Sequence, residues 1–484
     1  MSLSFDPTTL HTDLFIDGVW QKASNGARFP VENPATNEVI AHVADGGPED
    51  AALAIEAAGR AQAAWGKSTP RERADILRRA FELVIANTDR LAAIMTAEMG
   101  KPLAEAAGEV AYSAEMLRWF SEEAVRIGGD STISVDGNTR ILISKEPVGP
   151  SVLVTPWNFP LAMGARKIAP AVAAGCTMVF KPAELTPLTS LALVDIFQQA
   201  GLPDGVLNVV TTASAAPVVE NWTSSGIARK ISFTGSTGVG KILLRQAAEN
   251  VMRSSMELGG NAPFIVLADA DIEKAVDGAM KAKMRNMGEA CTAANRFFVH
   301  RSVLEEFSEK FSKKMSELQV GNGALAGTEV GPLIEQKGLD KVESLVADAV
   351  SKGARVLTGG TRPEGPDYFY TPTVLTDVPL NAELMSTEIF GPVAAITPFD
   401  SEDEVLRVAN DTVWGLVGYV FTENTGKAMR FSAELEVGMV GVNTGLVSNP
   451  IAPFGGVKQS GLGREGGKIG IEEFLEYKYT AIAI

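Results

Sequence analysis

The first part of the chain divides into two regions with different hydrophobic periods. Between residues 50 and 126, apolar side chains recur at steps of three and four, which predicts successive amphipathic helices. Between residues 132 and 144, two runs rich in β-branched residues surround Asp136 and Gly137. That pattern predicts a β-hairpin closed by a tight turn.

After residue 150, short apolar runs alternate with helical segments. Strands are expected at 152–154, 177–180, 206–210, 230–233 and 253–258, and helices at 160–174, 188–200, near 218 and at 241–250. A second alternating set begins at 264–267 with a helix expected from Ile272 to Met287, and it continues to about residue 443. Such alternation is typical of parallel βαβ units, which bind ligands at the carboxyl ends of their strands. The predicted fold is α/β, with two Rossmann-like doubly wound domains and a small additional β element.

The last residues, 477–484, form a β-type run with few charges. Left unpaired, such a strand would be an aggregation-prone edge, so we expect it to pair with another subunit. The alternative is an edge strand of the chain's own sheet.

Composition narrows the classes of function. The 484 residues carry 43 Lys and Arg against 59 Asp and Glu, a net charge of -16, which argues against nucleic acid and anionic membranes as partners. The longest uncharged apolar stretch, 168–180, is shorter than the roughly 20 residues that span a bilayer. The acidic N-terminus lacks a signal-peptide pattern, and there are only two cysteines, so we expect a cytoplasmic protein. Three scattered histidines offer no metal-ligand spacing, so no metal site is expected.

Two residues are candidates for chemistry by their setting alone. Glu257 is the only ionisable residue between Arg253 and Asp269, so burial should raise the pKa of its carboxyl and make it a plausible general base. The alternative is a structural carboxylate paired with a cation. Cys291 follows a predicted helix and could be a nucleophile, although a lone cysteine is more often a small core residue. Cys176, at a buried strand start, fits that second description.

A third candidate, Asn158, stands between a predicted strand and a predicted helix in a stretch without charges. Its amide could donate to an oxyanion, or it could cap the helix that follows. Residues 235–240 (GSTGVG) follow a strand and open a helix, a setting that suits a phosphate. Residues 461–466 (GLGREG) match the dinucleotide fingerprint better but have no preceding strand, so we exclude them.

Six segments together resemble the aldehyde dehydrogenase family: 155–160 (TPWNFP), 180–184 (FKPAE), 233–236 (FTGS), 256–260 (MELGG), Cys291 and 388–392 (EIFGP). Three others, 454–458 (FGGVK), 460–466 (SGLGREG) and 477–479 (YKY), most closely resemble its bacterial succinate-semialdehyde dehydrogenases. The resemblance covers essentially the whole chain. It implies that Cys291 attacks the aldehyde, that the Asn158 amide holds the oxyanion, and that Glu257 activates the water that releases the acid.

The resemblance also implies the domain roles and a dinucleotide site. Residues 1–130 and 145–256 would bind the cofactor, 257–445 would form the catalytic domain, and 446–470 would return to the first domain. Residues 131–144 and 471–484 would be oligomerisation strands of a homodimer or homotetramer. The implied cofactor residues are Pro156, Trp157, Lys181, Pro182, Ala183, Glu184, Gly235, Ser236, Leu258, Glu388 and Phe390. A carboxylate at Glu184 favours the 2′-hydroxyl of NAD over the 2′-phosphate of NADP, although Lys181 beside it could accept the phosphate.

For the substrate, the resemblance implies that Arg166, Arg285 and Ser448 hold a distal carboxylate, for which guanidinium groups are well suited. The alternative for Arg166 is a solvated surface arginine. The expected substrate is succinate semialdehyde. Glutarate semialdehyde is the first alternative, because one methylene contributes only about 1–3 kcal/mol of discrimination. A cofactor-independent cysteine hydrolase is the second, although no histidine lies near either motif.

Overall fold

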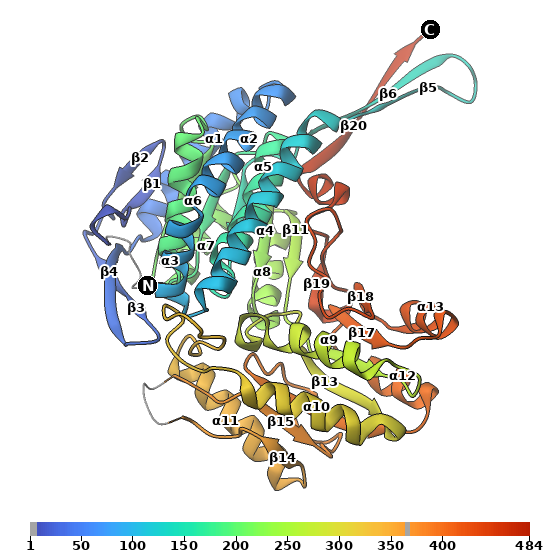
Figure 1. Ribbon diagram of the computed structural model, residues 1–484. Helices are drawn as coiled ribbons and strands as arrows, with labels where there is room; N and C mark the ends of the chain where they lie inside the picture. Colours follow the sequence, from blue (N-terminus) through green and yellow to red (C-terminus); the bar gives the residue numbers. More distant parts are fainter. Residues whose placement is uncertain (1–6, 364–367) are drawn as a thin grey trace.

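The computed structural model describes residues 7–363 and 368–484, which form two α/β bodies and a projecting arm of strands (Figure 1). The first body contains an eight-stranded sheet in the order β19-β11-β10-β7-β8-β9-β1-β2. Its strands are β1 (Leu14–Ile16), β2 (Val19–Gln21), β7 (Ser151–Val154), β8 (Met178–Lys181), β9 (Leu207–Val209), β10 (Lys230–Thr234), β11 (Arg253–Glu257) and β19 (Gly461–Leu462). The pairings among β7 to β11 are parallel, as the alternation predicts.

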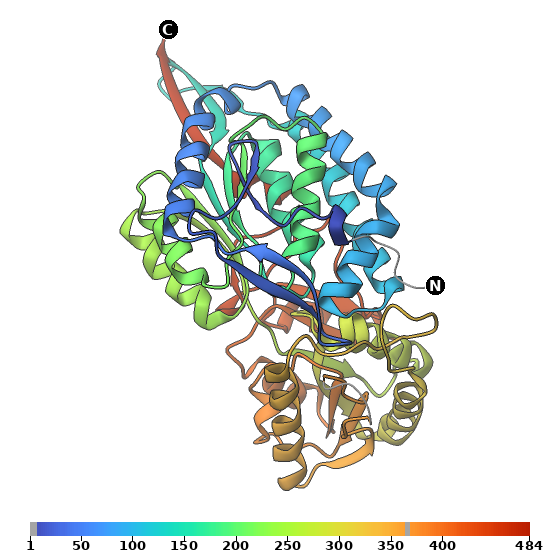
Figure 2. The same cartoon turned by 90° about the vertical axis from the view of Figure 1, so that its left-hand side faces the viewer.

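Helices cover both faces of this sheet because neighbouring residues of each strand point to opposite sides. On one face, Leu153 packs with residues of α2 (Pro70–Ala86), α4 (Leu103–Glu123), α5 (Pro160–Ala174) and α6 (Pro187–Gln199). On the other, Val152 and Val154 pack with α1 (Pro48–Trp65), α7 (Ala215–Ser224) and α8 (Thr237–Glu249). Helix α3 (Thr88–Met99) and the hairpin β3 (Arg28–Asn33)–β4 (Glu38–Ala44) complete this body (Figure 2). The predicted helices and strands of this region are present, with small shifts at their ends.

The second body repeats the plan with a seven-stranded sheet in the order β14-β15-β16-β13-β12-β17-β18. Its strands are β12 (Ala262–Val266), β13 (Ala294–His300), β14 (Arg355–Thr358), β15 (Thr373–Thr376), β16 (Val393–Phe399), β17 (Val417–Phe421) and β18 (Met439–Val442). Its helices are α9 (Ile272–Met284), α10 (Leu304–Glu317), α11 (Gln336–Ser351), α12 (Glu402–Asn410) and α13 (Thr425–Glu434). The expected α/β class with two doubly wound bodies is confirmed.

The projecting arm is a three-stranded sheet in the order β20-β6-β5. The hairpin β5 (Asp130–Ile133)–β6 (Thr139–Pro147) turns at Asp136–Gly137 as predicted. The terminal strand β20 (Leu475–Ala483) pairs antiparallel with β6 of its own chain along its whole length. One edge of β20 is therefore paired within the chain, as the alternative of an edge strand of the chain's own sheet expects. The other edge faces no strand in the described part of the chain, so pairing with a second copy stays a prediction.

The chain crosses between the two large sheets twice. It leaves the first sheet at Glu257, enters the second at Ala262, and returns after Val442 to form β19. Short 3-10 helices lie in the connections: η1 (Pro7–Thr9), η2 (Ala124–Arg126), η3 (Arg285–Gly288), η4 (Arg301–Val303), η5 (Glu383–Met385), η6 (Lys458–Ser460) and η7 (Lys468–Phe474). Within residues 7–363 and 368–484, no helix has the length and apolar character needed to cross a bilayer.

Candidate active site

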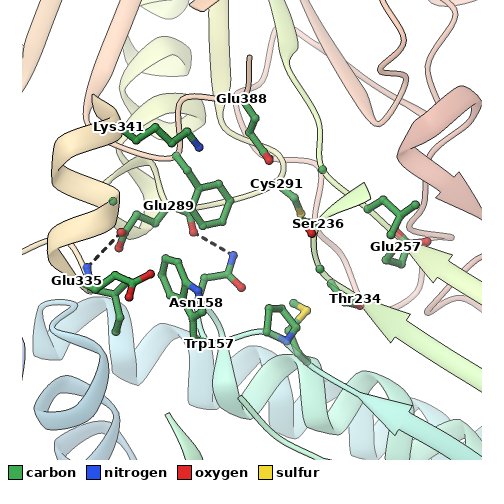
Figure 3. A pocket seen from close by; sticks show the side chains of 18 of the residues that line it. Trp157, Asn158, Thr234, Ser236, Glu257, Glu289, Cys291, Glu335, Lys341 and Glu388 are labelled. Atoms are coloured by element: carbon green, nitrogen blue, oxygen red, sulfur yellow. Dashed lines mark hydrogen bonds between the residues drawn. The ribbon is translucent and has the colours of Figure 1, made fainter. Parts of the chain in front are cut away.

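A cavity of about 340 Å³ lies where the two large sheets meet, at the carboxyl ends of β7, β10 and β11 (Figure 3). From the first body it is lined by Pro156, Trp157, Asn158, Met163, Thr234, Gly235, Ser236, Glu257, Leu258 and Gly259. From the second body it is lined by Glu289, Cys291, Ile334, Glu335, Lys337, Gly338, Lys341, Glu388 and Phe390. The three residues proposed for catalysis from the sequence therefore share one cavity, at the sheet edge where doubly wound folds bind ligands.

Cys291 lies in the loop between α9 and β13, and an unusual backbone turn places it there. The helix expected to reach Met287 ends earlier, because Asn286 and Met287 adopt the left-handed conformation with φ of 53° and 55°. Gly288 continues the turn with φ of 79°, and a Cβ there would lie 2.2 Å from the carbonyl oxygen of Gly391. The predicted helix end was wrong because helical periodicity carries no sign of this left-handed turn.

The surroundings of the Cys291 thiol oppose its ionisation. Burial raises its pKa to about 12, and the carboxylates of Glu388 and Glu257 act in the same direction, whereas Arg166 and Arg285 oppose them. An unperturbed thiol would be a few per cent ionised at neutral pH. A base or a cation brought beside the sulfur is therefore needed to form the nucleophilic thiolate.

Asn158 joins the loop of Cys291 to the first body. Its Nδ2 donates to the carbonyl oxygen of Glu289 at 3.0 Å, and its Oδ1 is buried with no partner among the described residues (Figure 3). The interpretation of Asn158 as a helix cap is wrong, because the residue at the N-cap position of α5 is Phe159. The amide instead faces the cavity beside Cys291.

Glu257 ends β11 and is 4 % exposed, and neither carboxylate oxygen has a hydrogen-bond partner in the described part of the chain. Burial, followed by the charge of Glu465, raises its pKa well above the usual range, as the sequence predicts. Burial also opposes ionisation of Glu465, but Lys167 at 2.6 Å and Arg166 at 2.9 Å outweigh it and lower the pKa of Glu465. Arg166 and Lys167 thus form their ion pairs with Glu465. Because no cation among the described residues is paired with the Glu257 carboxyl, that group is free to exchange a proton.

The residues expected around a dinucleotide fall into two groups. Pro156, Trp157, Gly235, Ser236, Leu258, Glu388 and Phe390 line the cavity, whereas Lys181, Pro182, Ala183 and Glu184 lie beyond it at the end of β8.

In the first group, the rings of Trp157 and Phe390 meet edge to face at 5.4 Å, and the Glu388 carboxylate accepts from the Gly260 amide at 3.2 Å. Burial raises the pKa of Glu388 to about 7. In the second group, Lys181 Nζ lies 2.8 Å from Glu184 Oε2.

The three residues expected at the substrate carboxylate are only partly brought together. Arg285 Nη1 donates to Ser448 Oγ at 2.9 Å, and its guanidinium lies 4.9 Å from the centre of the Phe159 ring. Arg166 is instead buried against Glu465 and the Phe454 ring. The interpretation of Arg166 as a solvated surface arginine is therefore wrong.

Comparison with known proteins agrees with this geometry. The model of the "Aldehyde dehydrogenase family" matches residues 20–480. The chain belongs to the aldehyde dehydrogenase family. Among the relatives of this aldehyde dehydrogenase is the succinate-semialdehyde dehydrogenase of Paenarthrobacter nicotinovorans, which is 55% identical over 92% of this chain and 99% of its own length.

Two further relatives differ in their names. The glutarate-semialdehyde dehydrogenase of Pseudomonas putida is 49% identical over 99% of both chains. A crystal structure described as an E. coli NADP dependent enzyme superposes with a TM-score of 0.98 at 47% identity, covering 99% of both chains. This aldehyde dehydrogenase is therefore an oxidoreductase whose relatives act on semialdehydes of more than one length.

The cavity of this aldehyde dehydrogenase fits a dinucleotide. Ser236 caps α8, so the first amides of that helix lie at the edge of the cavity, where they suit a pyrophosphate. Thr234 Oγ1, also at this edge, is buried with no partner among the described residues. In the part of the chain that the structure describes, no cluster of acidic, cysteine and histidine side chains could hold a metal ion.

Sequence reasoning missed several buried charges around this site. Lys167 and Glu465 form an ion pair across 298 residues, and Glu465 belongs to the segment 461–466 that was set aside as a false phosphate loop. Lys101 and Glu109 lie in a stretch that shows only helical periodicity. The glycine-rich segment around Glu465 could have marked this carboxylate as unusual. No local pattern, however, identifies Lys167 as the residue with which it pairs.

Proposed function

We propose that this aldehyde dehydrogenase oxidises succinate semialdehyde to succinate, with Cys291, Asn158 and Glu257 as its catalytic residues. The observation that carries the proposal is the convergence of a thiol, an amide and an unpaired carboxyl on one cavity, with the Arg285–Ser448 pair nearby. A succinate-semialdehyde dehydrogenase at 55% identity supports the same substrate.

The reaction begins at sulfur. The Cys291 thiolate forms a bond to the aldehyde carbon, and the carbonyl oxygen becomes the oxyanion of a thiohemiacetal. The Asn158 Nδ2 and the backbone amide of Cys291 would donate to that oxygen, an interaction whose loss typically costs about 10²–10³ in rate. For this, Nδ2 would share or exchange its present bond to the Glu289 carbonyl.

A dinucleotide held by the residues at the cavity would supply the acceptor for a hydride from the thiohemiacetal carbon, and Cys291 would then carry the acyl group as a thioester. Glu257 then takes a proton from water as the water oxygen attacks the thioester carbon, and the thiolate leaves as succinate is released. A carboxyl with a raised pKa and no ion pair is suited to that task, because a stronger base accepts the proton more readily.

For the cofactor we propose NAD ahead of NADP. Glu184 lies beside Lys181, and although burial opposes ionisation, the lysine lowers the pKa of the Glu184 carboxyl, so it is ionised at neutral pH. An anion at this place accepts from a ribose hydroxyl and repels a phosphate. Lys181 could still hold a phosphate, and an E. coli relative is described as NADP dependent. The residues 181–184 and those that line the cavity at 156–157, 235–236, 258, 388 and 390 would hold either dinucleotide.

For the substrate carboxylate we propose Arg285 and Ser448, with Arg166 acting at longer range. Arg285 is half-buried and keeps N–H donors beyond the one given to Ser448. Arg166 opposes the rise in the pKa of Cys291, so its charge reaches the reacting centre although Glu465 holds its side chain. Glutarate semialdehyde remains the second candidate, supported by a relative of that name at 49% identity.

The two large sheets support a division of roles between domains. We propose that residues 1–130 and 145–256 bind the cofactor, that 257–445 carry the nucleophile, and that 446–470 return to the first domain. The arm at 131–144 and 471–484 would join copies into a homodimer or homotetramer, because β20 has a free edge and its side chains Tyr477, Tyr479 and Ile482 are exposed. We place the protein in the cytoplasm, where two unpaired thiols, Cys176 and Cys291, remain reduced.

The test is a panel of aldehydes of graded length, each with and without a terminal carboxylate, assayed with NAD, with NADP and with neither. The proposal expects the highest kcat/KM for the four-carbon semialdehyde and no turnover without a dinucleotide. A maximum at five carbons would favour glutarate semialdehyde. Thioester or ester hydrolysis as the main activity, without any dinucleotide, would favour the cysteine hydrolase.

A further inference from the structure

A buried lysine lies directly behind the amide proposed to hold the oxyanion. Lys101 stands between α3 and α4 and is 1 % exposed. Its Nζ donates to the backbone carbonyl of Asn158 at 2.8 Å and to a carboxylate oxygen of Glu109, and it lies 4.2 Å from the centre of the Phe159 ring. Two of these three partners of the ammonium, the Asn158 carbonyl and the Phe159 ring, belong to residues 158 and 159.

The second oxygen of Glu109 fixes the helix that follows. It accepts from the backbone amides of Leu161 at 3.0 Å and Ala162 at 3.1 Å, in the first turn of α5. A carboxylate from another helix thus replaces the side-chain cap that α5 lacks. Together, Glu109 sets the position of the helix start and Lys101 that of the peptide two residues before it.

The same carbonyl is also tied to the loop of the nucleophile. Asn286 Nδ2 donates to the carbonyl oxygens of Asn158 at 3.1 Å and of Glu289 at 3.0 Å. Asn158 Nδ2 meets the Glu289 carbonyl from the other side at 3.0 Å. The Asn158 carbonyl is therefore held by Lys101 from the first body and by Asn286 from the second, and these two bonds fix the backbone from which the Asn158 side-chain amide projects.

We propose that Lys101 and Glu109 are positioning residues that fix the Asn158 amide where the thiohemiacetal oxyanion develops. The inference rests on the oxyanion role proposed above for Asn158. Neither residue lines the cavity, so neither is expected to touch the substrate or the dinucleotide. Their contribution to the reaction passes through the position of one amide, which stabilises the oxyanion of the thiohemiacetal and also that of the tetrahedral intermediate in thioester hydrolysis.

Lys101→Met keeps the length of the side chain but removes the charge and the donors. Displacing a catalytic group by about 1 Å can cost about 10²-fold, so we expect hydride transfer to slow by about 10- to 100-fold. The measurement is the single-turnover burst of reduced dinucleotide at saturating cofactor. The dissociation constant of the dinucleotide should change by less than about twofold, because its binding does not depend on the amide. The decay of the acyl-enzyme, followed by quenching and mass spectrometry, should slow as well, because water attack forms an oxyanion at the same place.

A double-mutant cycle with Asn158→Ala separates positioning from general destabilisation. Lys101→Met should slow the burst in the native background and add less than about twofold when the Asn158 amide is already absent. Glu109→Gln, which keeps an oxygen for the α5 amides, is the second variant and should show the same non-additivity. Glu98→Gln is the matched control, because Glu98 caps α6 through Leu188 and Thr189 as Glu109 caps α5, and it should leave the burst unchanged.

The outcomes distinguish the two proposals. If Asn158→Ala slows the burst but Lys101→Met slows it by the same factor in both backgrounds, the positioning role is wrong and the oxyanion role stands. A burst unaffected by either Lys101→Met or Glu109→Gln also overturns positioning. If Asn158→Ala itself leaves the burst unchanged, the oxyanion role fails and positioning fails with it.

Discussion

The contact between Arg285 and Ser448 makes substrate recognition quantitatively testable. Arg285→Met keeps an apolar stem beside Phe159 but removes the guanidinium that donates to Ser448 at 2.9 Å. A hydrogen bond to a charged group contributes about 1.5–3 kcal/mol, and each 1.4 kcal/mol is about tenfold in an equilibrium constant. Loss of the contact to a substrate carboxylate should therefore lower kcat/KM for succinate semialdehyde by about 10- to 150-fold, mostly through KM.

The comparison substrate is butanal, which has the same four carbons and no carboxylate. Because butanal has nothing to offer the guanidinium, its kcat/KM should change by less than about threefold in Arg285→Met. Ser448→Ala removes a neutral partner, whose hydrogen bond contributes about 0.5–1.5 kcal/mol, so it should cost succinate semialdehyde only about two- to tenfold. An equal loss for butanal and succinate semialdehyde in Arg285→Met would refute the assignment and indicate damage to the Cys291 loop instead.

Three further predictions concern the chemistry at sulfur and the dinucleotide. Cys291→Ala should abolish oxidation and the acyl adduct seen by mass spectrometry; an adduct elsewhere would contradict the nucleophile. Glu257→Gln should keep the burst of reduced dinucleotide but slow thioester hydrolysis by about 10²–10⁴-fold. Because burial and Glu465 raise the pKa of Glu257, hydrolysis in the native protein should accelerate with pH until that carboxyl is ionised and should be flat in the variant. Glu184→Ser should raise the ratio of kcat/KM with NADP to kcat/KM with NAD by about tenfold, because removing the repulsion between the carboxylate and the 2′-phosphate is expected to contribute about 1.4 kcal/mol. An unchanged ratio would mean that other residues determine the choice of cofactor.

The parts of the fold that follow from local pattern could be predicted from the sequence. Alternation of apolar runs with helical segments predicted the parallel strands β7 to β11, because each run must bury both faces of its strand, but it did not predict their order in the sheet. The left-handed turn at Asn286 and Met287 could not be predicted in this way, because both residues fit the periodicity of α9 and only tertiary contacts force them out of it.

The residues of the site also divide into those that local sequence pattern indicates and those that only tertiary contacts reveal. Cys291, Glu257 and Asn158 could be singled out because each stands in an apolar or glycine-rich setting where a polar group needs a reason. Glu465 and Lys101 could not, because Glu465 meets Lys167 across 298 residues and Lys101 reaches the Asn158 carbonyl across 57, and no local pattern indicates either contact. The resemblance implied that Arg166 contacts the substrate carboxylate. In the structure its guanidinium is instead paired with Glu465.

The two segments that cross between the large sheets are hydrogen-bonded to each other beside Glu257. Leu258, on the first crossing, donates its amide to the Ser460 carbonyl at 2.9 Å, and the Ser460 hydroxyl lies 2.7 Å from the Gly259 carbonyl oxygen. Bonded in this way, the two segments fix each other's backbone directly after Glu257. A change in either segment would therefore displace the carboxyl proposed to activate water, although Ser460 lies 201 residues after Gly259 in the sequence.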